Sequence, residues 1–310
     1  MKVLVIGAGA VGGYFGGRLL KAGRDVTFLV RPARAAELAK AGLVIRSRSG
    51  DAVLPNPPTV LAGRIREPFD VVLLSAKAYD LDSAMDAFAS AVGPHTAILP
   101  LLNGMRHLDT LRTRFGPARV LGGQCAIAAT LNPQREIVHL NDIHQLSFGE
   151  LDGTMSDRVR AIQDIVTGAR FDGKASPQIL LEMWEKWVFL STLAGSTCLM
   201  RAAVGDIAAA PGGADLVLGL LEECRAIAAA EGYAPRDAFV QRTRGIVTAA
   251  DSPMTASMLR DIENRAPIEA DHIIGDLLER GVSHRLPHNT LSLVYTNLRA
   301  YEARRSRIVS

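Results

Sequence analysis

The segment LEMWEKWVFLSTLAG carries one lysine between the two tryptophans of the chain. Lys186 lies between Trp184 and Trp187, and the following VFLSTLAGSTCLM contains no charged residue. A helix that is apolar on every side is usually buried, so Lys186 stands where a predicted helix enters a core or an interface. An ammonium in that place can donate a proton, because burial lowers its pKa toward a useful range. The alternative interpretation is a surface ion pair with Glu182, four residues earlier on the same helix face.

A glycine motif at the N-terminus predicts a second kind of chemistry. Gly7, Gly9 and Gly12 form G-x-G-x-x-G between the apolar run KVLVI and a helical pattern. In such a strand–turn–helix unit the first glycine allows a tight turn, the second lets a pyrophosphate approach, and the third lets helix and strand pack closely. The helix N-terminus favours the anion. The alternative is a purely structural turn. The predicted dinucleotide contacts are Gly7, Ala8, Gly9, Ala10, Val11 and Gly12.

The end of the second strand pattern bears on the choice of dinucleotide. An enzyme that uses NAD normally has Asp or Glu there, to bind the ribose hydroxyls. This chain has LVRPAR, with Arg31 and Arg34. A guanidinium suits a 2′-phosphate by charge and by geometry. We therefore expect NADP(H) as the cofactor, with Arg31 on the 2′-phosphate. The alternative is a solvated arginine and a loose choice of cofactor.

Two further polar residues follow apolar strand patterns. Lys77 comes after VVLLSA, and Asn103 comes after TAILPLL. Ligands of open α/β sheets bind outside the carboxyl ends of the strands. Each residue alone could be incidental to a loop, but two at the same edge predict a binding site.

The elements that must position these residues divide the chain in two. Strand and helix patterns alternate through the first half, which predicts a parallel sheet with helices on both faces. The late segments RVLGGQCAIAATL, REIVHL and HQLSFGE read as partly antiparallel strands. After about Ser176 the patterns are helical, with prolines such as Pro267 where helices would begin. We expect an α/β fold with an N-terminal Rossmann domain, residues 1–176, and an all-helical domain for substrate and catalysis, residues 177–310.

Composition excludes several classes of protein. The chain has 310 residues, 48% of them hydrophobic, and a net charge of +3, which is typical of a globular protein. Its basic residues are scattered, so no nucleic-acid partner is expected. Three widely spaced cysteines indicate reduced thiols of a cytoplasmic protein, with neither a disulfide nor a metal site. The N-terminus reads as a strand, without a signal peptide. No apolar run is long enough to predict a membrane span.

The chain resembles the ketopantoate reductase (2-dehydropantoate 2-reductase) family over essentially its whole length. The resemblance rests on GAGAVGG, SAKA, LLNGM, MWEKW and SMLRDIENRAPIEADHIIG, in that order. It implies a Rossmann domain followed by a helical domain, with the active site in the cleft between them. It also implies NADPH-dependent reduction of ketopantoate to pantoate, on the route to pantothenate and coenzyme A.

The resemblance also implies roles for individual residues. Lys186 matches the catalytic proton donor, and Glu269 matches a glutamate that organises the cofactor and the lysine. Asn103 matches an asparagine that contacts cofactor and substrate, and Lys77 a lysine on the cofactor side. Ser257 matches a substrate-binding serine. Ala128 aligns with a backbone contact to the cofactor. Taken from the sequence alone, Glu269 is an acid in the first helical turn after Pro267, where the helix dipole favours it.

Three positions depart from the family pattern. Leu190, Ala194 and Val204 stand where typical members have asparagines that hold the hydroxyl and carboxylate of the substrate. This leaves three hypotheses: a ketopantoate reductase, a reductase of a more apolar 2-oxo acid, and an NADP-binding protein without turnover. In each case the partner is a small molecule. The apolar helical domain makes a homodimer plausible.

Overall fold

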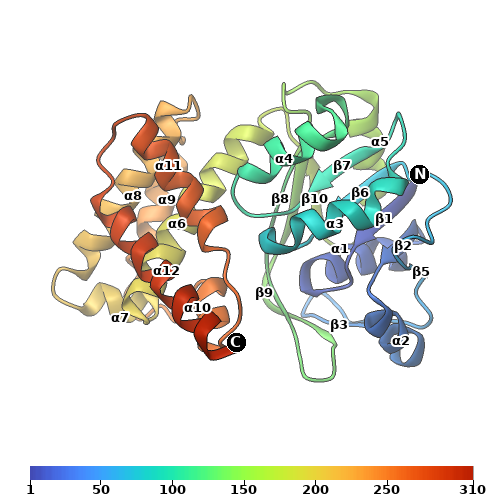
Figure 1. The fold of residues 1–310 in the computed structure, drawn as a ribbon, viewed down its shortest axis with the longest axis horizontal. Coiled ribbons are helices and arrows are strands. Elements are labelled where there is room, and N and C mark those ends of the chain that lie inside the picture. The colour runs from blue at the N-terminus through green and yellow to red at the C-terminus, as the bar shows by residue number, and fades with distance from the viewer. Residues whose placement is uncertain (310) are drawn as a thin grey trace. The chain divides into compact units, whose positions relative to one another are not determined.

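The computed structural model of the chain describes residues 1–309. It divides into two compact units, one formed by Met1–Leu102 and His107–Ile179, the other by Asn103–Arg106 and Leu180–Ser310. All strands belong to the first unit, blue to yellow-green in Figure 1, and the second unit is helical. The expected fold, a Rossmann domain followed by a helical domain, is confirmed. The chain passes from the first unit to the second after Ile179, three residues later than the boundary predicted from sequence at residue 176.

A five-stranded parallel sheet forms the centre of the first unit. Its strands follow the order β5-β2-β1-β6-β7, and every pair in it is parallel. Strands β1, β6 and β7 are buried almost throughout, as expected for apolar runs in a parallel sheet. The strands are β1 (Lys2–Ile6), β2 (Asp25–Leu29), β5 (Thr59–Val60), β6 (Val71–Leu74) and β7 (Ala97–Pro100).

A second sheet in the same unit has the order β10-β9-β3-β4, and β8 pairs antiparallel with β9. The segments REIVHL and HQLSFGE, expected as two strands, are parts of the single long strand β9. The short strands β3 and β4 pair with each other and were not expected from sequence. The strands are β3 (Leu43–Arg46), β4 (Ala52–Leu54), β8 (Gly122–Leu131), β9 (Ile137–Gly149) and β10 (Asp172–Ala175).

The helices of the first unit begin and end at residues suited to these places. The Oγ of Ser156 accepts a bond from the backbone N–H of Val159 at 3.3 Å and so caps α5. Gly23 follows α1 with a φ of 76°, a left-handed conformation that glycine adopts without strain. The helices are α1 (Ala10–Lys21), α2 (Pro32–Ala41), α3 (Leu81–Phe88), α4 (Arg106–Phe115) and α5 (Asp157–Val166), with 3₁₀ turns at Ala78–Asp80, Ala89–Ala91 and Pro117–Arg119.

The second unit is built around the long helix α6, Ile179–Met200. Residues 191–198 of α6 are all buried, as its lack of charges predicted. The hydroxyls on this stretch stay satisfied by bonding to helix carbonyls: Thr192 Oγ1 donates to Val188 O at 2.9 Å, and Thr197 Oγ1 to Leu193 O at 2.7 Å. The other elements are α7 (Val204–Ala209), α8 (Gly213–Ala230), α9 (Asp237–Val247), α10 (Ser257–Glu263), a π-helical turn (Asp271–Gly275), α11 (Asp276–Ser283) and α12 (Asn289–Val309).

The cysteines are buried in these cores. Burial raises the pKa of both Cys198 and Cys224 to about 12, so these thiols stay protonated at neutral pH. Across residues 1–309, no helix is both long and apolar enough to cross a membrane.

Candidate functional site

The glycine turn between β1 and α1 has the geometry of a phosphate-binding turn. Gly7 has a φ of 86°, which explains the requirement for glycine at the first position. A Cβ added at Gly12 would lie 2.2 Å from Ser75 Oγ and 2.7 Å from the carbonyl oxygen of Gly7, so the third glycine permits close packing. A Cβ added at Gly9 would have no atom within 4 Å. The second glycine therefore borders open space.

The N-terminus of α1 is suited to an anion. Gly9 is the N-cap residue, no side chain caps the helix, and the first turn has no acidic residue. The unsatisfied backbone N–H groups at such an end favour a phosphate. Open space beside Gly9 and an uncapped positive helix end both fit the pyrophosphate of a dinucleotide.

The two arginines after β2 have different surroundings. Arg34 is largely buried, and its Nε donates to the carbonyl of Ala8 in the glycine turn at 3.2 Å. It therefore supports the turn. The side chain of Arg31 is 79% exposed and lies 3.3 Å from Asp80 in an ion pair. Such an exposed pair holds the guanidinium weakly, so Arg31 can reorient toward a ligand phosphate.

The first unit contains two more candidate cofactor-binding residues. Lys77 follows a strand, and Ala128 lies within one. Lys77 follows β6 and is the residue immediately before the 3₁₀ turn Ala78–Asp80, at the carboxyl edge of the parallel sheet as expected. Ala128 lies at a register irregularity of β8, and its N–H donates to Asn141 Oδ1 at 3.3 Å. Because this N–H is engaged, a backbone contact from Ala128 to a cofactor would use its carbonyl or require exchange of the bond.

Lys186 lies on α6 in the second unit, among buried neighbours. Trp184 and Trp187 are 2% and 1% exposed, while Lys186 itself is only partly buried. The two indole rings lie 4.8 Å apart, and Trp184 stacks on Tyr233 at 5.7 Å. Lys186 is therefore a half-buried lysine beside a tightly packed aromatic cluster.

The residue before the lysine forms a pair that the sequence analysis missed. The carboxylate of Glu185 is buried and accepts from the backbone N–H of Arg236 at 3.0 Å and from its Nε at 2.8 Å. The Nη2 of Arg236 bonds the second carboxylate oxygen. This bidentate arrangement fixes the rotation of α6 about its axis. An adjacent Glu–Lys pair in a helix points to different sides, so sequence gave no sign of this distant partner.

Asn103 does not belong to the unit whose strand precedes it. Residues Asn103–Arg106 group with the second unit, although both flanking segments belong to the first. Gly104 has a φ of 79°, and a Cβ there would lie 2.7 Å from the carbonyl oxygen of His272. The loop that carries Asn103 thus packs directly on the π-helical turn. Glycine is required both by conformation and by space.

His272 on that turn was also missed from sequence. It is buried, and desolvation lowers its pKa below 6.5, against smaller opposing effects of Glu269, Asp276 and the backbone of Asn103. Its ring is therefore neutral at physiological pH. The carboxyl of Glu269 and the backbone of Asn103 both influence this pKa, so both lie near the His272 ring.

The placement of Glu269 differs from the expectation. It was expected in the first helical turn after Pro267, but helical structure begins at Ala270. The carbonyl of Glu269 accepts the N–H of Ile273 at 3.0 Å, so Glu269 immediately precedes the first helical residue. Its side chain is 8% exposed. A carboxylate at this end still gains from the helix dipole.

Ser257 is exposed and opens α10. The preceding Ala256 donates its N–H to Thr197 Oγ1 on α6 at 3.4 Å, which attaches the start of α10 to the lysine helix. The structure therefore gathers four candidates in the second unit: Asn103, Lys186, Ser257 and Glu269. The remaining candidates lie in the first unit: the glycine turn, Arg31, Lys77 and Ala128.

The three positions that depart from the family pattern are not equivalent. Leu190, one turn after Lys186, is partly exposed on the same helix face. Ala194 and Val204 are only 4% and 1% exposed. The backbone N–H of Val204 donates to Met254 O at 3.0 Å. Leu190 is thus the only one of the three with appreciable open surface in residues 1–309.

The strand order and the glycine turn define a Rossmann-type dinucleotide-binding protein with an added helical unit. Comparison with known proteins narrows this class. Residues 3–153 match the family model Ketopantoate reductase PanE/ApbA, and residues 178–302 match the model Ketopantoate reductase PanE/ApbA C terminal. The chain therefore belongs to the ketopantoate reductase family, as the sequence motifs indicated. It is an oxidoreductase, and its cofactor is a nicotinamide dinucleotide.

Similar proteins include both an uncharacterized oxidoreductase and enzymes with named activities. The uncharacterized oxidoreductase YkpB of Bacillus subtilis is 38% identical, covering 98% of this chain and 99% of its own. The 2-dehydropantoate 2-reductase of Geobacter metallireducens has a TM-score of 0.88 at 27% identity, covering 97% and 99%. A D-mandelate dehydrogenase, solved with NADH and anilino(oxo)acetate, has a TM-score of 0.86 at 20% identity, covering 99% and 100%. The fold is thus shared by enzymes named for different substrates, 2-dehydropantoate and D-mandelate.

Proposed function

We propose that this protein reduces a 2-oxo acid to the 2-hydroxy acid with NADPH, and that its substrate is ketopantoate. The product would be pantoate, made in the cytoplasm for pantothenate and coenzyme A. The observation that carries the proposal is the setting of Lys186. Lys186 is a half-buried lysine between the buried residues Glu185 and Trp187, in the same unit as Asn103 and Glu269.

Reduction of a 2-oxo acid requires a hydride at the carbonyl carbon and a proton at the carbonyl oxygen. The bound nicotinamide supplies a hydride to the carbonyl carbon of the substrate. Negative charge then develops on the carbonyl oxygen, and a positive group or a proton at that oxygen lowers the barrier. Lys186 supplies both, since its ammonium first bonds the oxygen and then donates a proton to it. In this proposal Asn103 orients the carbonyl, Glu269 keeps the lysine protonated, and Ser257 binds the substrate carboxylate.

The residues of the first unit bind the cofactor in this proposal. The N–H groups of residues 7–12 hold the pyrophosphate, Arg31 holds the 2′-phosphate, and Lys77 and Ala128 contact the nicotinamide half. The exposure of Arg31, 79%, supports its assignment, because the guanidinium can move without breaking a buried contact.

A second substrate class is favoured by Leu190. This side chain is apolar and partly exposed one turn from Lys186, where the family resemblance implies a polar contact. A pocket wall without a partner for the substrate hydroxyl costs about 1–3 kcal/mol when that hydroxyl is buried. The alternative substrate is therefore a 2-oxo acid with an apolar side chain.

Steady-state NADPH oxidation with a panel of 2-oxo acids tests the proposal. The panel needs ketopantoate, 2-oxoisovalerate, which lacks the hydroxyl, and a bulkier aryl 2-oxo acid. Highest kcat/KM with ketopantoate supports the first substrate, and highest kcat/KM with an apolar acid supports the second. NADPH binding without turnover of any of them would leave only a binding protein. The expected homodimer stays a prediction, which light scattering tests.

Leu190→Asn tests the role of the pocket wall. An amide at this position can bond the substrate hydroxyl, so kcat/KM for ketopantoate relative to 2-oxoisovalerate should rise by about tenfold, the factor that 1.4 kcal/mol represents. The matched control is Ala194→Asn, which places the same amide at a site that is 4% exposed and should chiefly lower stability. An unchanged or reduced ratio in Leu190→Asn would show that other residues bind the hydroxyl.

A further inference from the structure

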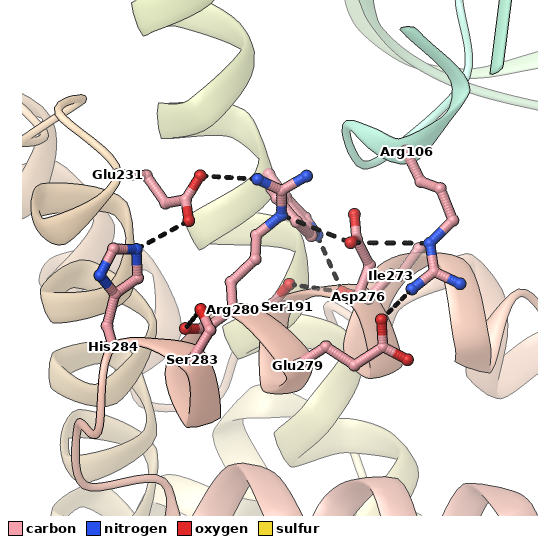
Figure 2. Close-up of polar contacts among 10 residues, drawn as sticks. Arg106, Ser191, Glu231, Ile273, Asp276, Glu279, Arg280, Ser283 and His284 are labelled. Atoms are coloured by element: carbon pink, nitrogen blue, oxygen red, sulfur yellow. Dashed lines mark hydrogen bonds and ion pairs between the residues drawn. The ribbon is translucent and has the colours of Figure 1, made fainter. Parts of the chain in front are cut away.

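The helix after Glu269 opens with a π-helical turn, Asp271–Gly275. π-turns are rare and occur often at functional sites. Within this turn, the carbonyl of Ile273 accepts two side-chain bonds from α6 (Figure 2). Trp187 Nε1 donates at 2.8 Å and Ser191 Oγ at 3.3 Å. Both donors are buried, Trp187 at 1% and Ser191 at 0% exposure.

Ile273 also forms a hydrogen bond with Glu269. The N–H of Ile273 donates to the carbonyl of Glu269 at 3.0 Å. One residue therefore bonds the indole of Trp187 on one side and the backbone of Glu269 on the other. Because Trp187 directly follows Lys186 in the chain, two hydrogen bonds link the position of the lysine backbone to that of Glu269.

The π-helical turn also supports the loop that carries Asn103. The carbonyl of His272 leaves room only for a glycine at position 104. At the end of the turn, the buried carboxylate of Asp276 lies 3.6 Å from Arg106, the last residue of the loop excursion. Arg106 also pairs with Glu279. The turn thus contacts the elements that carry three candidate site residues: Asn103, Lys186 and Glu269.

Arg280 lies against both indole rings. Its guanidinium carbon lies 5.5 Å from the ring centre of Trp184 and 5.7 Å from that of Trp187, within range of a cation–π attraction. Arg280 is itself fixed by Asp276 at 3.4 Å and Glu231 at 2.6 Å (Figure 2). These contacts favour one orientation of the Trp187 ring, in which Nε1 faces the π-helical turn.

We propose that Trp187 is a positioning residue, whose indole N–H holds Lys186 in register with the π-helical turn and so with Glu269 and the Asn103 loop. This inference rests on the reduction proposed above. It assigns Trp187 no contact with the substrate or the reacting atoms. The consequence is that loss of the N–H should affect kcat more than KM, since the proton donor is displaced while the binding surfaces remain.

A bulky ring in a core also has a packing role, and Trp184 provides the matched control for it. Trp184 is 2% exposed against 1% for Trp187, and the two rings share the Arg280 contact. Trp184 stacks on Tyr233 with the ring planes 13° apart, whereas the bond to Ile273 O comes from Trp187. Replacing either tryptophan by phenylalanine removes similar volume, but only Trp187→Phe removes this bond.

The experiment compares Trp187→Phe with Trp184→Phe in the full chain. In Trp187→Phe, kcat should fall by about tenfold or more, because a displaced general acid loses part of its contribution to the rate, with KM values changed by less than about threefold. Amide hydrogen exchange in residues 269–277 should rise well above that of Trp184→Phe. Ser191→Ala should also lower kcat, with less loss of packing. Ser191→Thr keeps the hydroxyl, so its kcat should be close to that of wild type.

Equal kcat losses and equal exchange in the two tryptophan variants would overturn the proposal, because packing alone would then explain both. Unchanged kcat in Trp187→Phe would also overturn it. If Trp187→Phe fails to fold, the Ser191 pair decides: Ser191→Ala with wild-type kcat and exchange refutes the inference. Failure of the proposed function is distinct from these outcomes, since it shows as a wild-type protein that turns over no 2-oxo acid.

Discussion

The two glycines Gly9 and Gly12 should separate cofactor binding from folding when each is changed to alanine. At Gly9 the backbone has a φ of −84° and a ψ of −163°, which any residue adopts, and the added Cβ meets no atom within 4 Å. At Gly12 the added Cβ would lie 2.7 Å from the carbonyl oxygen of Gly7 and 2.2 Å from Ser75 Oγ. The first methyl group enters open space, and the second enters an occupied core.

The magnitudes follow from these contacts. Alanine at Gly9 removes unfolded-state freedom, worth about 0.4–1 kcal/mol, and gives up a favourable N-cap residue at a similar cost. The stability of Gly9→Ala should therefore lie within about 0.5 kcal/mol of wild type. Ser75 Oγ can rotate away from the new methyl group at Gly12, but the carbonyl of Gly7 is backbone. Overpacking of this kind costs about 1–3 kcal/mol.

Cofactor binding should show the opposite order. The methyl group at Gly9 occupies the space in which the pyrophosphate is proposed to lie, so NADPH affinity should fall by about tenfold or more, or 1.4 kcal/mol. Urea unfolding with and without NADPH measures both effects. At a concentration of about 100 Kd the cofactor stabilises wild type by about 2.7 kcal/mol, and a tenfold weaker variant gains about half of that.

Two results would refute this reasoning. If Gly9→Ala binds NADPH as tightly as wild type by calorimetry, the pyrophosphate does not lie at this turn. If Gly12→Ala has wild-type stability without cofactor, the close packing of α1 on the sheet is not what requires glycine there.

Further outcomes are expected for the other groups. Lys186→Ala should lower kcat by about 10²-fold or more while calorimetry shows retained NADPH binding; near-normal turnover would remove the lysine from the mechanism. Arg31→Ala should weaken NADPH by about 1.5–3 kcal/mol and leave NADH nearly unchanged, and a wild-type protein that uses both cofactors equally would contradict this. Burial lowers the pKa of His272 below 6.5, so the unfolded chain binds a proton there that the folded protein excludes. Stability should therefore be present above pH 6.5 and be lost as pH falls below it, by up to about 1.4 kcal/mol per unit. In His272→Gln, urea unfolding should show a smaller decrease of stability with falling pH than in wild type. An equal decrease would show that other groups cause the pH dependence.

Much of the fold could be predicted from local patterns. The glycine turn is specified by three residues within one βαβ unit, and its geometry depends on their own φ angles and on contacts close in sequence. The buried stretch of α6 could be predicted because a helix without charges has no face suited to water. The long strand β9 was divided wrongly, since polar residues in its middle resemble a turn. Pairing with β8, which sequence does not display, keeps that segment extended.

The candidate site could be predicted only in part. The identities of Lys186, Asn103, Ser257 and Glu269 came from motifs that resemble a family. The assignment of Asn103 to the second unit depends on Gly104 packing against His272, more than 160 positions away in the chain. No local pattern carries that information, because the contact is a property of two packed surfaces.

The class of chemistry could be predicted from residue types and their local spacing: a dinucleotide turn, a lysine at the head of a buried helix, and the two kinds of unit that carry them. These features depend on residue type and on periodicity over a few turns. The side chains that support the lysine could be identified only from contacts between segments that are far apart in the chain. The bond from Trp187 to Ile273, the ion pair of Glu185 with Arg236 and the burial of Ala194 and Val204 all join segments distant in sequence. Their partners are selected by packing between helices, where an offset of one residue would direct each side chain to a different neighbour.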